Sequence, residues 1–283
     1  MAPLLVASTP IGNIGDATDR LREAIESADV IAAEDSRKFH RLVSDLGIRF
    51  SGKVVSFFEG NESDRLPTLL DEIEAGKVIL LLTDAGTPAV SDPGYRLIKE
   101  VLGRNLPFTV IPGPSAVLTA LLYSGYATAS FAFDGFLPRT ESGLDRYFNS
   151  IKNESRTIVL FESPRRLESS LKVAARILGE ERDIAICREM TKKYEEIFRG
   201  DFEQALAWAN SRQSDDGIKG EVTLVIAPQL HEMDYSDDEI LARAKELSDA
   251  DHSARDIAAI IALEFDIPKR RAYDLANQSK NLD

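Results

Sequence analysis

The chain has 283 residues, of which 43% are hydrophobic and 29% are charged, and its formal net charge is −13. This composition is that of an ordinary globular protein, and the length suits two domains, or two domains with an appendage. The negative charge argues against nonspecific nucleic-acid binding through overall charge. The single cysteine excludes an internal disulfide and a cysteine-based metal cluster, and the three histidines are scattered, which argues against a zinc site.

Three features favour a cytoplasmic location, away from a membrane. The lone Cys187 fits a reducing compartment. The N-terminus lacks the basic start of a signal peptide, and the Pro and Gly at positions 10 and 12 interrupt its apolar stretch. No apolar run approaches the length that spans a bilayer.

Short apolar runs alternate with helical patterns through the first half of the chain. The runs at residues 4–8, 30–33, 54–58, 78–82 and 107–111 have the length of buried strands. Amphipathic or apolar helical patterns lie between them and after the last. This alternation predicts an α/β domain with a largely parallel sheet.

The loop at residues 84–94 is the most informative connection. It follows the apolar run 78–82 and reads DAGTPAVSDPG before a helical pattern begins. Ligands of open α/β sheets bind at the carboxyl ends of strands. Gly86 and Gly94 would let the backbone approach a ligand closely.

Three other loops, at residues 9–16, 34–37 and 112–116, also follow predicted strands. All four loops are either ordinary connections or one rim around a small molecule. A Walker lysine loop is missing from the sequence, and TPIGNIGD lacks the dinucleotide spacing. A nucleoside triphosphatase and a Rossmann NAD site are therefore disfavoured.

The pattern loosens at residues 125–136, where we place a domain boundary. Strands are predicted at 157–161, 184–187, 195–198 and 221–226, with helices between them. An acidic turn at 233–238 then precedes an all-helical tail. Helical patterns at 254–263 and 269–277 flank residues 264–268, as in a helix-turn-helix. The predicted domains are 1–124, 125–230 and 231–283.

Seven ordered motifs carry a resemblance to a known family. LLVASTPIGNIGD, AAEDSR, LLTDAGTPAVSDPG and IPGPSA resemble the tetrapyrrole-methylase superfamily. FESPRR, CREMTKKYEEIFRG and GEVTLVIAP narrow the resemblance to the ribosomal RNA small subunit methyltransferase I family. The resemblance covers nearly the whole chain, including the helical tail.

The resemblance implies two α/β domains with a cleft between them, S-adenosyl-L-methionine as cofactor, and a homodimer. It also implies 2′-O-methylation of a cytidine ribose in the decoding region of 16S, small-subunit rRNA. The partner would be that rRNA or the assembled small ribosomal subunit. No metal and no membrane partner are expected.

By position in the motifs, the resemblance also implies the cofactor-binding residues. They are Thr9, Pro10, Asp84, Gly86, Thr87, Ser115, Ala116, Leu160 and Phe161. The adenine and ribose need apolar walls with backbone and hydroxyl partners, and the sulfonium tolerates a nearby carboxylate. Asp84 could instead cap a turn.

Methyl transfer to a ribose hydroxyl requires positioned reactants and eventual loss of the hydroxyl proton. A base can assist, and the candidates are Glu34, Asp35 and Glu162. For Glu34 and Asp35 the alternative is a structural role as a helix N-terminal cap.

Basic residues, most of them in the middle of the chain, are the candidate RNA contacts. Residues 139–199 hold 13 basic and 11 acidic residues, in contrast to the acidic remainder. Family members often have His where this chain has Arg165, which favours phosphate contact there over a histidine base. The alternative is a solvated charged face. The candidates are Arg37, Arg139, Arg165, Arg166, Lys192 and Lys193.

Two other functions stay open. A methylase of the same fold could act on a tetrapyrrole or another small molecule, but it would not require the basic middle segment or the helical tail. A non-catalytic RNA-binding assembly factor would leave the four-loop rim unexplained.

Overall fold

The computed structural model describes residues 2–213, 217–229, 236–250, 252–265 and 267–279. The chain forms two compact units, Met1–Gln229 and Leu230–Asp283. The first unit contains two sheets, and the second is helical. The predicted domain boundaries stay predictions.

The first sheet has five strands in the order β3-β2-β4-β1-β5. All of its strand pairings are parallel, as predicted. Parallel strands joined by helices place their carboxyl ends at one edge, where the four loops emerge. The bounds are β1 Leu4–Ala7, β2 Val30–Ala33, β3 Lys53–Ser56, β4 Ile79–Leu82 and β5 Phe108–Ile111.

Both faces of this sheet are covered, which is why its central strands read as continuous apolar runs. Leu5 and Leu80 share a core cluster with helices α1, Asp19–Ser27, and α2, Ser36–Leu46. Leu4 and Leu81 pack on the opposite face with α3, Glu62–Glu74, and α4, Tyr95–Gly103. A short 3-10 helix, Ile14–Asp16, lies in the first loop.

The second sheet is mixed and has the order β6-β7-β10-β8-β9. Strands β6 and β7 pair in parallel, and the other three pairings are antiparallel. The sequence missed β6 because a bulge interrupts it, so its apolar alternation breaks. The bounds are β6 Phe131–Phe136, β7 Thr157–Glu162, β8 Asp183–Arg188, β9 Glu196–Asp201 and β10 Val222–Ile226.

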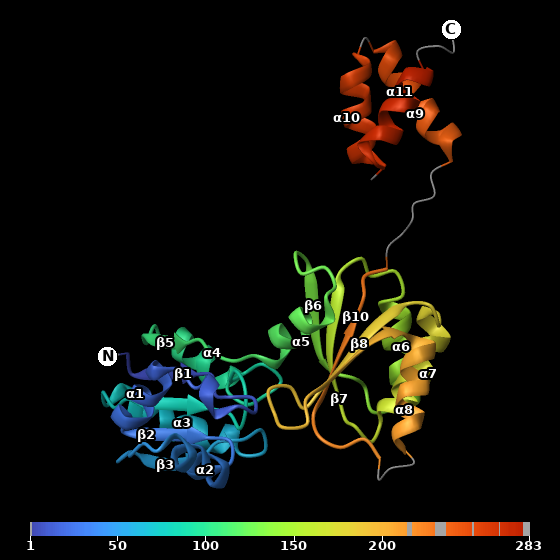
Figure 1. Cartoon of the computed structure of the whole chain (residues 1–283). Coiled ribbons are helices and arrows are strands. Elements are labelled where there is room, and N and C mark those ends of the chain that lie inside the picture. Colours follow the sequence, from blue (N-terminus) through green and yellow to red (C-terminus); the bar gives the residue numbers. More distant parts are fainter. Residues whose placement is uncertain (1, 214–216, 230–235, 251, 266, 280–283) are drawn as a thin grey trace. The chain divides into compact units, whose positions relative to one another are not determined.

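Helix α5, Ala116–Ser124, joins the two sheets. It begins soon after β5 of the first sheet, yet its Val117, Ala120 and Leu121 pack on Val159 and Val225 of the second sheet. The other face of the second sheet carries α6, Glu141–Ser150, α7, Leu167–Leu178, and α8, Phe202–Gln213. Figure 1 shows α5 and the group α6 to α8 on opposite sides of this sheet.

The described residues of the helical unit form three helices, α9 Asp237–Asp249, α10 Ala254–Glu264 and α11 Lys269–Ser279. The sequence predicted the last two as a helix-turn-helix. Ile240, Ile257, Ile261 and Leu275 belong to a core cluster of this unit alone. Part of the predicted acidic turn, residues 233–235, lies outside the described residues. Over the described part of the chain, none of the helices combines the length and the hydropathy needed to cross a membrane.

Candidate active site

A cavity of about 390 Å³ opens between the carboxyl edge of the first sheet and the second sheet. The loop after β4 and the start of α5 form one part of its wall. The ends of β6 and β7, the start of β10 and Met190 from the loop after β8 form the rest. The predicted rim of loops therefore encloses a space of small-molecule size.

Backbone hydrogen bonds fix the loop after β4 to the loop after β1. The Thr9 amide donates to the Gly86 carbonyl at 2.8 Å, and the Gly86 amide donates to the Thr9 carbonyl at 3.1 Å. Gly86 has φ +81°, a conformation that favours glycine. The Thr9 hydroxyl donates to the Thr83 carbonyl, and Thr9 is only 1% exposed. Thr9 thus holds the loop and does not line the cavity.

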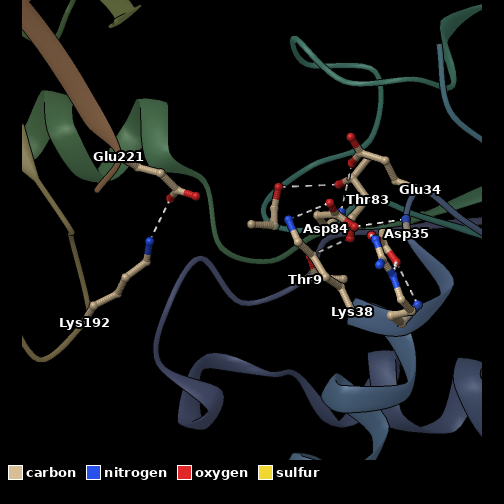
Figure 2. Close-up of polar contacts among 10 residues, drawn as sticks. Thr9, Glu34, Asp35, Lys38, Thr83, Asp84, Lys192 and Glu221 are labelled. Carbon is tan, nitrogen blue, oxygen red and sulfur yellow. Dashed lines mark hydrogen bonds and ion pairs between the residues drawn. The ribbon is translucent and has the colours of Figure 1, made fainter. Parts of the chain in front are cut away.

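Glu34, Asp84 and Lys38 form a connected polar group at the cavity wall (Figure 2). The Asp84 amide donates to Glu34 Oε2 at 3.1 Å. Asp84 Oδ2 lies 2.8 Å from Lys38 Nζ, and Asp84 Oδ1 accepts from the Asp35 amide at 3.1 Å. Burial raises the pKa of Glu34, and the charge of Asp84 adds to that rise. Lys38 offsets part of the negative charge.

Asp92 is a third cavity carboxyl, which the predicted site did not include. Burial raises the pKa of Asp92 to about 7, and repulsion by Glu34 and Asp84 acts in the same direction. Ala89 and Ser91, which both precede Asp92 in this loop, adopt left-handed φ values of 68° and 63°. Such strained backbone, held by surrounding structure, is concentrated at functional sites.

Glu162 lies at the end of β7, and its carboxylate already has three donors. It accepts hydrogen bonds from Arg166, from the Ser170 hydroxyl and from the Ser163 amide. Glu162 is 2% exposed. A carboxylate so fully engaged is poorly disposed to accept a proton from a substrate.

Glu221 and Lys192 lie on the other side of the site from Asp84 (Figure 2). Lys192 Nζ lies 2.9 Å from Glu221 and 2.9 Å from Glu189. The neighbouring Gly220 has φ +92°, and a Cβ there would lie 2.4 Å from Glu189 Cγ. Position 220 is therefore restricted to glycine by both conformation and space.

The structure brings eight of the twelve predicted cofactor and catalytic residues to the cavity. They are Glu34, Asp84, Gly86, Thr87, Ser115, Ala116, Phe161 and Glu162. Leu160 faces the helices on the other side of the second sheet and is 1% exposed. Thr9, Pro10 and Asp35 also lie outside the lining.

Asp35 acts as the N-cap of α2. The Arg37 side chain and the Arg37 amide both donate to its carboxylate, and they hold the pKa of Asp35 far below its ordinary value. A carboxylate with so low a pKa is a weak base, so these contacts favour Glu34 over Asp35.

Sequence reasoning left several lining residues out of the site. Gly220 and Glu221 stand in the motif GEVTLVIAP and Met190 in CREMTKKYEEIFRG, so those motifs held a signal. Phe136 lies at residues 125–136, where the sequence pattern loosens, and no motif marked it as a site residue. The other omitted lining residues are Ile11, Ala85, Val90, Ser91, Asp92, Val117, Ser163, Pro164, Val222 and Thr223.

The six predicted RNA contacts differ in their surroundings. Arg37 pairs with Asp35, and Lys192 pairs with two glutamates. Arg166 donates to Glu162 and to the Pro138 and Leu137 carbonyls, so its contacts are internal.

The remaining three candidates, Arg139, Arg165 and Lys193, are exposed. Lys193 stacks over the Tyr194 ring at 5.3 Å. Among the described residues we find no ion pair for Arg139 or Arg165. These two arginines are therefore the better placed to contact phosphate.

The family model of tetrapyrrole (corrin/porphyrin) methylases matches residues 3–206. The chain belongs to this family. Two relatives of this methylase bear the name ribosomal RNA small subunit methyltransferase I. The Mycobacterium bovis protein is 40% identical over 278 residues, which cover 98% of this chain and 95% of that protein. The Bacillus subtilis protein is 34% identical over 280 residues, covering 97% and 94%.

Solved structures of other methyltransferases share the fold. Uroporphyrin-III-C-methyltransferase from Thermus thermophilus has a TM-score of 0.55 at 18% identity, over 79% of this chain and 93% of that one. The methyltransferase CobJ has a TM-score of 0.60 at 14% identity, over 81% and 95%. The predicted fold class, two α/β domains with a cleft and a helical tail, is thus confirmed.

The cavity suits S-adenosyl-L-methionine, the methyl donor that this family uses. Ile11, Val117 and Met190 offer apolar walls for an adenine. The carboxyls of Asp84 and Asp92 line the same cavity, where negative charge would suit the sulfonium and ammonium groups of this cofactor. No group of side chains that could hold a metal ion is found among the described residues.

Proposed function

We propose that this methylase transfers a methyl group to the 2′-hydroxyl of a cytidine ribose in the decoding region of 16S, small-subunit rRNA. The observation that carries the proposal is near full-length similarity to proteins named ribosomal RNA small subunit methyltransferase I. That similarity spans the helical unit as well as both sheets. Exposed Arg139 and Arg165 in the second half of the first unit suit an RNA substrate.

We assign cofactor binding to the loop after β4 and to the start of α5. Asp84 and Thr87 present a carboxylate and a hydroxyl, Gly86 lines the cavity without a side chain, and Ser115 and Ala116 line it at the start of α5. Phe161 closes the site from the second sheet. When bound, the cofactor would supply the methyl group, and these residues would hold it in the cavity.

The acceptor hydroxyl loses a proton when it is methylated, so a nearby base assists the reaction. Two cavity carboxyls have a raised pKa, Glu34 and Asp92. The Asp92 pKa, at about 7, is near the value that suits a base at neutral pH. We assign proton acceptance to Asp92, with Glu34 raising its proton affinity.

A methylase acting on a tetrapyrrole is the second candidate. The solved structures named above support it only through the fold, since their identities are below 25%. The third candidate, a non-catalytic assembly factor, leaves the cavity and its carboxyls unexplained. We further propose a homodimer in the cytoplasm, acting on rRNA or on assembled small subunits.

A methyl-transfer assay separates these functions. The protein and labelled S-adenosyl-L-methionine are incubated with naked rRNA, with assembled small subunits that lack the modification, and with uroporphyrinogen. We expect label in an RNA substrate and none in the tetrapyrrole. Label in uroporphyrinogen alone would establish the second candidate, and no label with any substrate would favour the third. Size-exclusion chromatography with light scattering tests the dimer.

A further inference from the structure

A bulge in β6 turns one phenylalanine toward the cavity. The pairing of β6 with β7 shifts register between Phe133 and Phe136. Gly135 within the shift has φ +74°, which lies in the left-handed region. Bulges beside active sites commonly redirect a side chain. Phe136 is 60% exposed and lines the cavity, whereas Val90, the other exposed apolar side chain of the lining, is 38% exposed.

A ring contact and the hydrogen bonds of the next residue hold the ring of Phe136 in place. Its centroid lies 5.4 Å from that of Phe161, at an interplanar angle of 62°. The next residue, Leu137, donates its amide to the Phe161 carbonyl, and Arg166 donates to the Leu137 carbonyl. A large apolar ring is thus held in place while much of its surface faces solvent. A ring ordered in this way can stack on a ligand at a low cost in conformational entropy.

Phe136 stands at the rim of the cavity. A Cβ on the preceding Gly135 would lie 3.2 Å from the Ser91 hydroxyl, so the β6 bulge meets the loop after β4 there. Val90 and Phe136 flank this contact, one on each segment. A cavity of about 390 Å³ holds one small molecule, so an acceptor nucleotide has to be presented at this rim.

We propose that Phe136 stacks on the base of the acceptor nucleotide and thereby places its ribose over the cavity. The inference rests on the proposed RNA substrate and adds the recognition element. Proteins that bind single-stranded RNA stack unpaired bases on exposed aromatic rings. Arg139, three residues beyond Phe136, and Arg165, beside the lining residue Pro164, are exposed cations for the flanking phosphates.

The central experiment is a double-mutant cycle between the protein and the RNA. Phe136→Leu keeps an apolar side chain and removes the aromatic face. An abasic ribose at the acceptor position removes the base. With wild type, we expect the abasic acceptor to lower kcat/KM by about tenfold. The Phe136→Leu variant should have a kcat/KM on normal RNA that is lower by a similar factor. Its kcat/KM should not fall further when the acceptor nucleotide lacks its base. Additive effects of the two changes would overturn the proposal.

Control variants separate stacking from other roles. Leu102→Ala removes a 55% exposed apolar side chain from α4 and should leave kcat/KM unchanged. The Phe136→Trp variant keeps an aromatic face and should methylate RNA with a kcat/KM close to that of wild type. The Phe136→Leu variant should bind S-adenosyl-L-methionine with a Kd within about twofold of the wild-type value. A cofactor Kd weakened as much as the RNA KM would assign Phe136 to the adenine. Loss of the dimer in Phe136→Leu would assign it to a subunit interface. Either result contradicts the proposal.

A binding measurement decides the inference even if wild type fails to methylate rRNA. The new indole in Phe136→Trp should be quenched by a single-stranded cytidine oligonucleotide, and the indole in Leu102→Trp should not. Absence of quenching would refute stacking. Failure of methylation together with specific quenching would refute only the proposed reaction.

Discussion

Asp92 shows how one half-buried carboxyl links stability to pH. Its pKa is about 7 in the folded protein, against an ordinary value of 3.8. Between about pH 4 and pH 7 the folded state therefore keeps a proton that the unfolded state has lost. The free energy of unfolding falls as pH rises through this window because of Asp92. Glu34, Asp84 and Glu221 contribute to the rise through their charges.

We predict that Asp92→Asn stabilises the ligand-free protein at pH 8 and not at pH 4. After allowance for solvent screening, the gain at pH 8 should be about 2 kcal/mol. Urea unfolding at both pH values measures it, with Asp45→Asn on the exposed side of α2 as the control. The same variant should methylate slowly if Asp92 accepts the proton. An equal stability change at the two pH values would show that the Asp92 pKa is not raised.

Two adjacent arginines should behave oppositely. Arg166→Ala leaves the buried Glu162 carboxylate without its ion pair and should destabilise the fold by about 3–5 kcal/mol. Arg165→Ala should leave stability unchanged. It should reduce the slope of log K against log salt concentration for RNA binding by about the amount expected for one lost phosphate contact. Thermal unfolding and RNA titrations at several salt concentrations measure both. Loss of stability in Arg165→Ala, or an unaltered salt slope, would contradict the assignment.

At the scale of elements, strand prediction succeeded where burial alone dictates sequence. Strand β2 was predicted with its observed bounds, and β4 to within one residue, because both are buried on both faces. Strand β6 lies at the edge of its sheet and contains a bulge, so neither a continuous apolar run nor a regular alternation marks it. Phe136 was missed for the same reason.

The site was predictable where a motif lies at the carboxyl end of a strand, on the loops of the first sheet and at the end of β7 in the second. Asp84, Gly86 and Ser115 were found because parallel strands send their following loops to one edge. Thr9 and Leu160 belong to the right segments, but their side chains face away from the cavity. Asp92 and Glu221 stand in two of the motifs, but their charged neighbours include residues that are distant in sequence, and the motifs do not reveal those contacts.

The turn before β10 gives a prediction at this scale. In Gly220→Ala the new Cβ would collide with Glu189 Cγ and hold an alanine at φ +92°. We expect a loss of about 2 kcal/mol in stability, and weaker cofactor binding because the neighbouring Glu221 lines the cavity. Calorimetry and urea unfolding measure the two effects. Gly217→Ala has a similar φ with open space around its Cβ and controls for backbone strain alone. Equal losses of stability in Gly220→Ala and Gly217→Ala would show that the collision with Glu189 contributes nothing.

At the scale of the molecule, the helical unit has its own core and the sheets have theirs. We predict that a chain ending at Gln229 folds and binds S-adenosyl-L-methionine like the full protein, but methylates rRNA poorly. The helical unit would then serve RNA docking, for which Lys269 and Arg270 offer exposed cations. Circular dichroism, calorimetry and methylation rates test this. Full activity of the truncated chain would refute the docking role, and loss of cofactor binding would make the helices part of the core.

The most direct test of the account is to map the methyl group on the RNA. Small subunits that lack the modification are incubated with the protein and S-adenosyl-L-methionine, and the rRNA is digested to nucleosides and fragments for mass spectrometry. We predict one added methyl group, on the ribose of a decoding-region cytidine, and its loss from the product of an Asp84→Ala variant that binds the cofactor weakly. A methyl group on a base, on another region of the rRNA, or on no RNA at all would contradict it.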